Sequence, residues 1–198
     1  ISFYYYTHMF IRKNKYFLII KSIKDINLKN IKKRDKFSII YRNKNNLENA
    51  SDLLNFRRFC KQKSIKFYVA NNTKLAILLN SDGIYISAFN KSFKPLSIKK
   101  LNFNIIGSAH NLQEIEIKKK QGCKTILFSK LFLVEYDKTA PYLGVVKFNN
   151  YLKINKYLIP LGGISIDNLN SLNNINCRGF ALLSEIKKKP AKIINRLF

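Results

Sequence analysis

The stretch "LIPLGGISIDNLNSL", residues 158–172, joins an apolar run to two adjacent glycines and then to a segment that begins with a helix-capping pattern. The chain of 198 residues contains only 7 glycines, so a pair at one place indicates a local demand of the backbone. Glycine allows turns and close approaches that a Cβ would block. A buried strand, a tight turn and a helix, in that order, form the repeating unit of a β/α protein.

Apolar runs of this kind recur along the whole chain. They are continuous where an exposed antiparallel strand would alternate, which is typical of parallel strands buried on both faces. We expect eight strands, at residues 15–20, 37–41, 65–70, 83–87, 103–107, 125–128, 157–161 and 179–183.

Helix-like segments lie between these runs. The clearest are residues 46–63 and 111–122. In the second, Asn111 stands in the N-cap position, Glu114 follows three residues later as in a capping box, and Gly122 provides a stop. The segments after the first and fourth strands are short and predict one or two helical turns at most.

Eight alternating units predict a compact (β/α)8 TIM barrel with some shortened helices. An open doubly wound sheet, which would use only five or six of the strands, is the alternative. We expect a single barrel domain over residues 15–198, preceded by an extension at 1–14. Because residue 1 is not Met, either the start is non-standard or translation begins at Met9.

The formal charge of +26 would suit a polyanionic partner, but the basic residues are spread along the chain and no nucleic-acid-binding motif appears. A genome rich in A and T also explains the abundance of Lys, Asn and Ile. The three cysteines lack metal-ligand or disulfide spacing and predict buried thiols in a reducing cytoplasm. The longest apolar run is broken by Lys130, so we expect neither a membrane span nor a specific nucleic-acid partner.

In a β/α barrel the site is built at the carboxyl ends of the strands. Gly162 and Gly163 follow the seventh strand, and Ser184 follows the eighth. Loops at these two places commonly hold a phosphate by backbone N–H groups at a helix start. The sequence therefore predicts a phosphate site there, although the glycine pair is also explained by a tight strand-to-helix turn alone.

Several motifs, in this order and spacing, resemble the thiamine-phosphate synthase and TenI family. They are "IIYRNK", "DGIYIS", "IIGSAHNLQEIE", "GCKTILFSKLF", "APYLG", "IPLGGISIDNL" and "GFALLSEI", between residues 36 and 186. The resemblance implies a β/α barrel and a thiazole phosphate or thiamine phosphate ligand. In the synthase branch it further implies that a pyrimidine diphosphate and a thiazole phosphate are joined with loss of pyrophosphate, assisted by magnesium.

The family positions are only partly kept. The two cations that grip pyrophosphate remain as Arg42 and Lys44, while the two aspartates that bind magnesium in the synthase branch are replaced by Asn71 and Asn90. Neutral amides attract a hard cation weakly, so magnesium is doubtful and no cofactor is expected with confidence. The Thr-x-Thr-Lys loop becomes Val134 to Asp137, with Lys138 one place late.

The thiazole-phosphate side is better preserved. The resemblance implies that Gly162, Gly163, Leu183 and Ser184 bind phosphate and that Ser108 contacts substrate. His110 matches the position proposed as the base in the TenI branch, whose members need no metal; it also suits a plain solvent-side residue before a helix. Three hypotheses stay open: a metal-independent tautomerase, a catalytically silent binder of a thiamine precursor, and an active synthase with an altered site.

Overall fold

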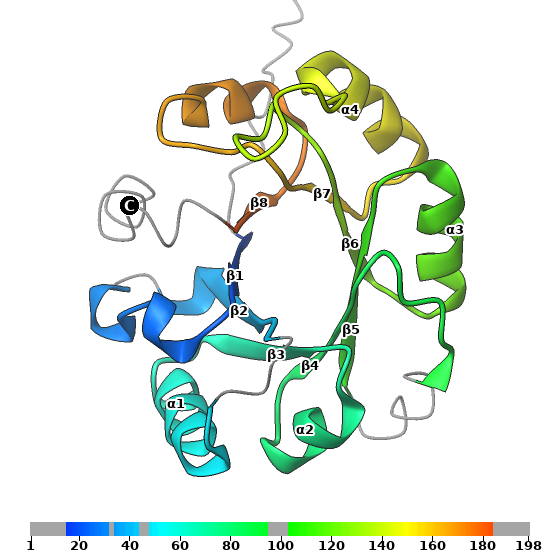
Figure 1. Cartoon of the computed structure of the whole chain (residues 1–198). Coiled ribbons are helices and arrows are strands. Elements are labelled where there is room, and N and C mark those ends of the chain that lie inside the picture. Colours follow the sequence, from blue (N-terminus) through cyan, green and yellow to red (C-terminus); the bar gives the residue numbers. More distant parts are fainter. Residues whose placement is uncertain (1–14, 32–33, 44–47, 95–102, 184–198) are drawn as a thin grey trace, which may run out of the picture.

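The computed structural model describes residues 15–31, 34–43, 48–94 and 103–183. Eight parallel strands pair in the order β7-β6-β5-β4-β3-β2-β1-β8 and form a ring (Figure 1). An isolated parallel bridge between Leu161 and Ala181 joins the last two strands and closes the ring. The predicted barrel is therefore confirmed, and the open sheet is excluded. The strands are β1 Lys15–Ile20, β2 Phe37–Tyr41, β3 Lys66–Ala70, β4 Gly83–Ile86, β5 Asn104–Ala109, β6 Thr125–Phe128, β7 Leu158–Pro160 and β8 Gly179–Leu182.

Alternate residues of each strand enter two separate cores. In β1, Phe17 and Ile19 point into the barrel, whereas Leu18 and Ile20 belong to the layer between strands and helices. Both faces of the strands are thus buried, which explains why their sequences are continuously apolar. The interior cluster consists of Phe17, Ile19, Ile40, Tyr68, Tyr85, Ile106, Leu127, Ile159, Leu161 and Ala181.

The described part of the chain has four α-helices around the ring, namely α1 Ala50–Gln62, α2 Thr73–Leu78, α3 Leu112–Lys120 and α4 Gly144–Ile154 (Figure 1). In its described part, the segment between β1 and β2 forms three 3-10 turns, η1 Ile23–Asp25, η2 Leu28–Asn30 and η3 Arg34–Lys36, as its shortness predicted. A further 3-10 helix, η5 Leu169–Asn174, follows β7. The barrel is compact because these connections replace full helices.

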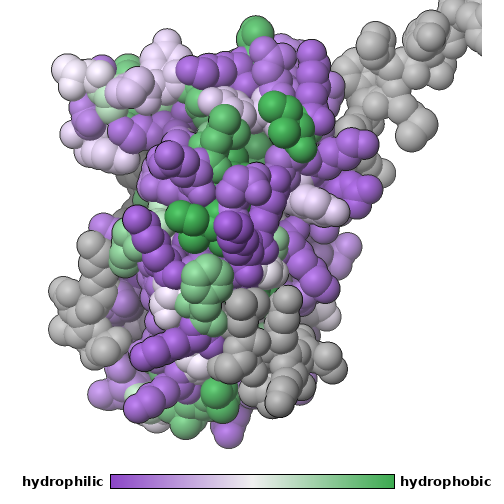
Figure 2. Space-filling model, turned by 90° about the vertical axis from the view of Figure 1, so that its right-hand side faces the viewer, coloured by the Kyte–Doolittle hydropathy of each residue, from purple (hydrophilic) through white to green (hydrophobic). Residues whose placement is uncertain are grey.

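The surface seen in Figure 2 is mostly hydrophilic, with apolar side chains scattered between polar ones. None of the described helices has the length and hydropathy of a membrane span. Cys60, Cys123 and Cys177 are free and buried, as predicted. Burial raises the pKa of the Cys60 and Cys123 thiols to about 12, so neither is a ready nucleophile. The predicted extension at 1–14 lies outside the described residues, and the domain boundary at residue 15 stays a prediction.

Candidate functional site

A small pocket opens at the carboxyl ends of the strands, with a volume of about 130 Å³. We call it the carboxyl-end pocket. This volume is below the roughly 300–1,000 Å³ typical of ligand pockets and suits one small group of a ligand. Lys44 and Ser184 lie outside the described residues. The pocket brings together six of the predicted site residues: Arg42, Ser108, His110, Gly162, Gly163 and Leu183.

The glycine pair in this pocket has a strict backbone role. Gly162 and Gly163 have φ values of +94° and +68°, which favour glycine. A Cβ on Gly163 would lie 2.3 Å from the carbonyl oxygen of Leu133 and 2.4 Å from that of Phe132. The loop after β6 therefore packs directly on the loop after β7, and only glycine fits between them.

Hydrogen bonds fix these two loops to each other. Phe132 N donates to the carbonyl oxygen of Gly162 across 3.0 Å, and Leu131 N donates to that of Leu161 across 2.9 Å. On the other side, the Asn168 side chain donates to the carbonyl oxygen of Gly163 across 2.7 Å and accepts from Ser165 N. The predicted turn is thus held by hydrogen bonds on both sides, and its backbone forms one wall of the pocket.

Arg42 and Ser108 lie near a buried tyrosine in the same pocket. Tyr85 is 1% exposed and points into the barrel from β4. Burial raises the pKa of its hydroxyl, while a hydrogen bond from Ser108 and the positive charge of Arg42 act in the opposite direction. Sequence reasoning missed Tyr85 because it lies inside an apolar strand. Its polar end belongs to the pocket floor.

His110 is held in place by Glu114. The backbone N–H of His110 donates to Glu114 Oε2 across 2.7 Å, and the ring Nδ1 lies 3.1 Å from the same oxygen. Asn111 caps α3 as predicted, since its Oδ1 accepts from Glu114 N. In a capping box the Glu114 carboxylate would accept from the backbone N–H of the N-cap residue, Asn111. Here it accepts from the backbone N–H of His110 instead. When Nδ1 carries the proton, this contact leaves Nε2 as the acceptor of the ring.

The two positions that replace the expected aspartates are bonded to each other. Asn90 Nδ2 donates to Asn71 Oδ1 across 3.0 Å, and Ser87 N donates to the same oxygen. Asn71 Nδ2 in turn donates to Ser87 Oγ across 2.7 Å. Asn71 has a φ of +56°, a conformation that asparagine tolerates. The side chains form a neutral network that links the ends of β3 and β4.

Helix α3 anchors the loop that carries Asn90. The Lys118 ammonium is fully buried and donates to the carbonyl oxygen of Asn90 and to Gln121 Oε1. Gln121 Nε2 donates to the carbonyl oxygens of Asn90 and Ser92. Burial lowers the pKa of Lys118. These contacts fix the backbone at Asn90, so its side chain stays directed at Asn71.

Lys130 also lines the carboxyl-end pocket, at the end of β6. Its Nζ lies 3.8 Å from Asp137 Oδ2 and 5.9 Å from the centre of the Tyr136 ring. The Thr139 hydroxyl, and also Lys130, lower the pKa of Asp137. The sequence placed Lys130 at a strand end without giving it a role. Here it supplies a positive charge beside Gly162, partly balanced by Asp137.

The described residues contain no group of three or more His, Cys, Asp or Glu side chains that suits a metal ion. What they form is a β/α barrel with a cationic pocket beside a glycine turn. Residues 21–186 match the family model described as thiamine monophosphate synthase. The chain therefore belongs to the thiamine monophosphate synthase family, as the motifs suggested.

Individual relatives are distant. A thiamine-phosphate synthase from Prochlorococcus marinus is 26% identical over 131 residues, which cover 64% of this chain and 37% of that protein. One from Clostridioides difficile is 24% identical over 68% of this chain and 65% of its own length. The matches thus span less than two thirds of either relative. The structure of a thiamine phosphate pyrophosphorylase from Pyrococcus furiosus aligns with a TM-score of 0.69 at 16% identity, covering 94% of this chain and 98% of the other.

Proposed function

We propose that this barrel binds a thiazole phosphate or thiamine phosphate at its carboxyl-end pocket and acts in thiamine biosynthesis without the magnesium-dependent synthase reaction. The observation that carries the proposal is the network of Asn71, Ser87 and Asn90. Its amides satisfy one another and bring no negative charge to the place where the synthase branch has aspartates. A site for Mg²⁺ usually includes one or two carboxylates.

In this proposal, the phosphate group of the ligand binds at the glycine turn. Gly162 and Gly163 line the pocket without side chains of their own, and Lys130 lies beside Gly162 with a charge that suits a phosphate. Leu183 adds an apolar wall, and Ser184 is proposed to complete the cup. Arg42, with Lys44, is proposed to hold a second anionic group, such as a carboxylate of the ligand.

His110 is the proposed base of a thiazole tautomerase reaction. A base removes a proton from one carbon of the tautomer, and its conjugate acid returns a proton elsewhere as the ring becomes aromatic. The Glu114 contact supports this role, because it orients the ring. Free, buried cysteines support a reducing cytoplasm as the place of the reaction.

Three assays on the purified chain separate the hypotheses. Isomerisation of the thiazole tautomer phosphate without metal would support the tautomerase. Tight binding of thiazole phosphate without turnover would identify a silent binding protein, which the loss of the Thr-x-Thr-Lys loop favours. Magnesium-dependent formation of thiamine phosphate would establish a synthase and contradict the proposal, and absence of any binding would exclude the first two.

A further inference from the structure

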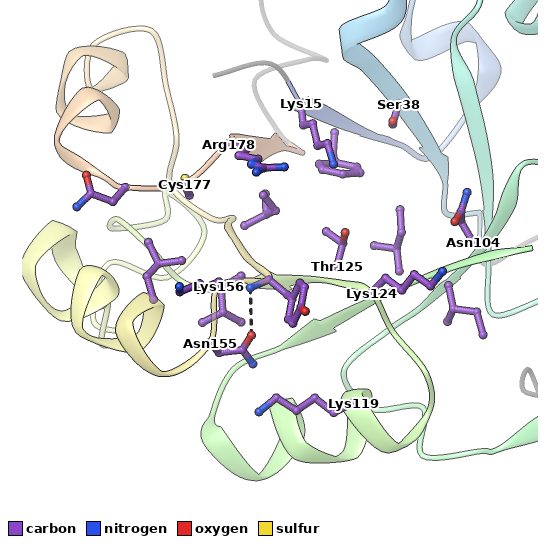
Figure 3. Close-up of a pocket in the computed structure, with 18 of the residues that line it drawn as sticks. Lys15, Ser38, Asn104, Lys119, Lys124, Thr125, Asn155, Lys156, Cys177 and Arg178 are labelled. Atoms are coloured by element: carbon purple, nitrogen blue, oxygen red, sulfur yellow. Dashed lines mark hydrogen bonds between the residues drawn. The ribbon is translucent and has the colours of Figure 1, made fainter. Parts of the chain in front are cut away.

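A second and larger cavity lies at the opposite end of the barrel, where the strands begin. Its volume is about 1070 Å³. Figure 3 shows Lys15, Lys124, Lys156 and Arg178 placed around this opening, on different elements of the barrel. We call it the amino-end pocket. Proposed catalysis uses none of its residues, so whatever it binds is independent of the proposed function.

The strand starts supply the positive charge of this pocket. Lys15 and Lys66 are the first residues of β1 and β3, and Lys36, Lys124 and Arg178 directly precede β2, β6 and β8. In a parallel barrel all strand starts meet at one end, so residues far apart in the sequence form one ring. Each lysine alone resembles an ordinary surface residue. Together they surround a concave opening.

Most of this charge is unbalanced. Asp35 is the one carboxylate among the described residues that line the pocket. Among the described residues, Lys119 pairs with Glu116 across 2.7 Å, but no carboxylate lies within 4.0 Å of the other lining cations. A concave surface of one sign concentrates counter-ions. The unbalanced cations are Lys15, Lys36, Lys66, Lys124, Lys153, Lys156 and Arg178.

The wall and floor add two further features. Asn155 is 5% exposed, and its Nδ2 has no hydrogen-bond partner among the described residues, although its Oδ1 accepts from Tyr157 N. An unpaired buried donor costs stability. Phe17 and Tyr68, from the interior cluster, line the floor. The pocket thus combines aromatic surface below with cations above.

We propose that the amino-end pocket binds a small molecule that carries two or more phosphate groups. Phosphate oxygens would be held by the lysine and arginine ring, and a planar group, where present, would lie toward Phe17 and Tyr68. The volume fits a compact ligand. The charge surrounds a cavity whose floor is apolar, which favours a small molecule over a nucleic acid duplex.

Isothermal titration of the whole chain with inorganic tripolyphosphate tests this site. We expect one bound molecule per chain. Replacing Lys15, Lys124 and Arg178 by Gln should weaken binding roughly tenfold, because the ring loses three of its positive charges. The matched control replaces Lys29, Lys61 and Lys74, which are exposed elsewhere, and should change affinity less than about twofold.

A second variant leaves the charge unchanged. Ser38→Trp fills the pocket and should abolish binding, while thermal unfolding checks that the variant is folded. Titration with ATP distinguishes a nucleotide from bare polyphosphate, since only ATP gains from the aromatic floor. The proposal is overturned if tripolyphosphate does not bind, if several molecules bind per chain, or if pocket and control variants lose affinity equally. Binding of an oligonucleotide with equal loss in both variants would indicate a diffuse basic surface instead.

Discussion

Asn90 donates its side-chain amide to Oδ1 of Asn71 across 3.0 Å, so the two positions where the family's synthase branch has aspartates are joined in this chain. This contact connects residues on the loops after β3 and β4. Two aspartates at these positions would attract a cation, whereas the two amides form a neutral hydrogen bond. The proposed chemistry of the carboxyl-end pocket therefore relies on cations and on His110 rather than on a metal ion.

Placing carboxylates at positions 71 and 90 should make this neutral pair negatively charged and responsive to Mg²⁺. In the double variant Asn71→Asp, Asn90→Asp, two negative groups would lie within hydrogen-bond distance of each other, and their repulsion should lower the melting temperature at neutral pH. Added Mg²⁺ should recover part of the loss if the geometry suits a cation. Calorimetric melting with and without Mg²⁺ measures both effects. The control Asn55→Asp, Asn150→Asp adds the same charge on the exposed surface and should show no specific response to Mg²⁺.

The glycine turn allows a matched comparison. Gly163 and Gly144 have nearly equal φ values of +68° and +69°, but a Cβ on Gly144 would meet nothing within 4 Å. Gly144→Ala should cost only the left-handed conformation, about 1–2 kcal/mol. Gly163→Ala adds a clash with two backbone carbonyls and should cost at least about 3 kcal/mol. Urea unfolding measures both; equal losses would show that crowding at Gly163 is relieved by loop movement.

Substitutions of His110 and Glu114 should lower kcat by different amounts. If the chain is a tautomerase, His110→Ala should lower kcat by a factor of roughly 100 to 10,000. Glu114→Gln should lower kcat less, because the ring keeps its place but loses a charged partner. Glu116→Gln, which removes an exposed ion pair with Lys119 on the same helix, is the control. Unchanged turnover in His110→Ala would remove this residue from the mechanism.

The strands could be predicted closely and the site only in part. Residues 15–20, 37–41 and 125–128 match β1, β2 and β6 residue for residue, because burial on both faces leaves a continuous apolar run. Helix α4 was implied by the eight alternating units, but no residue range was predicted for it. It contains two β-branched valines and two asparagines, and its N-cap residue makes no side-chain cap hydrogen bond. Packing of Phe148 and Leu152 stabilises it, and this packing is visible only in three dimensions.

The relationships within the site also depend on long-range contacts. The turn at Gly162 and Gly163 and the Asn111 cap of α3 could be predicted, because a glycine pair and a capped helix are local patterns. The pairing of Asn71 with Asn90 joins residues 19 positions apart, and no local rule predicts it. The ring of basic residues around the amino-end pocket depends even more on long-range contacts. Its lysines are indistinguishable from other lysines of a basic chain until the barrel closes.

Glu48 connects the loops that follow β1 and β2. Its Oε1 accepts from Ile23 N across 3.0 Å, and its Oε2 accepts from Asn43 Nδ2 across 2.9 Å and from the Tyr41 hydroxyl. Burial alone would raise the pKa of this carboxyl, but hydrogen bonds from Ser22, Tyr41 and Asn43 outweigh it, so the pKa is lowered. The charged form therefore stabilises the folded state.

The sign of the pH effect follows from this lowered pKa. Glu48 contributes stability above its ordinary pKa of 4.5, and the contribution is lost as the pH falls through the lower pKa of the folded state. Glu48→Gln should cost about 1–2 kcal/mol at pH 7, a range reduced for partial exposure. Below pH 4.5 the difference from wild type should shrink. Urea unfolding at pH 7 and pH 3 measures this; Glu116→Gln should show a difference near zero at both values, and a constant loss for Glu48→Gln would assign its role to packing.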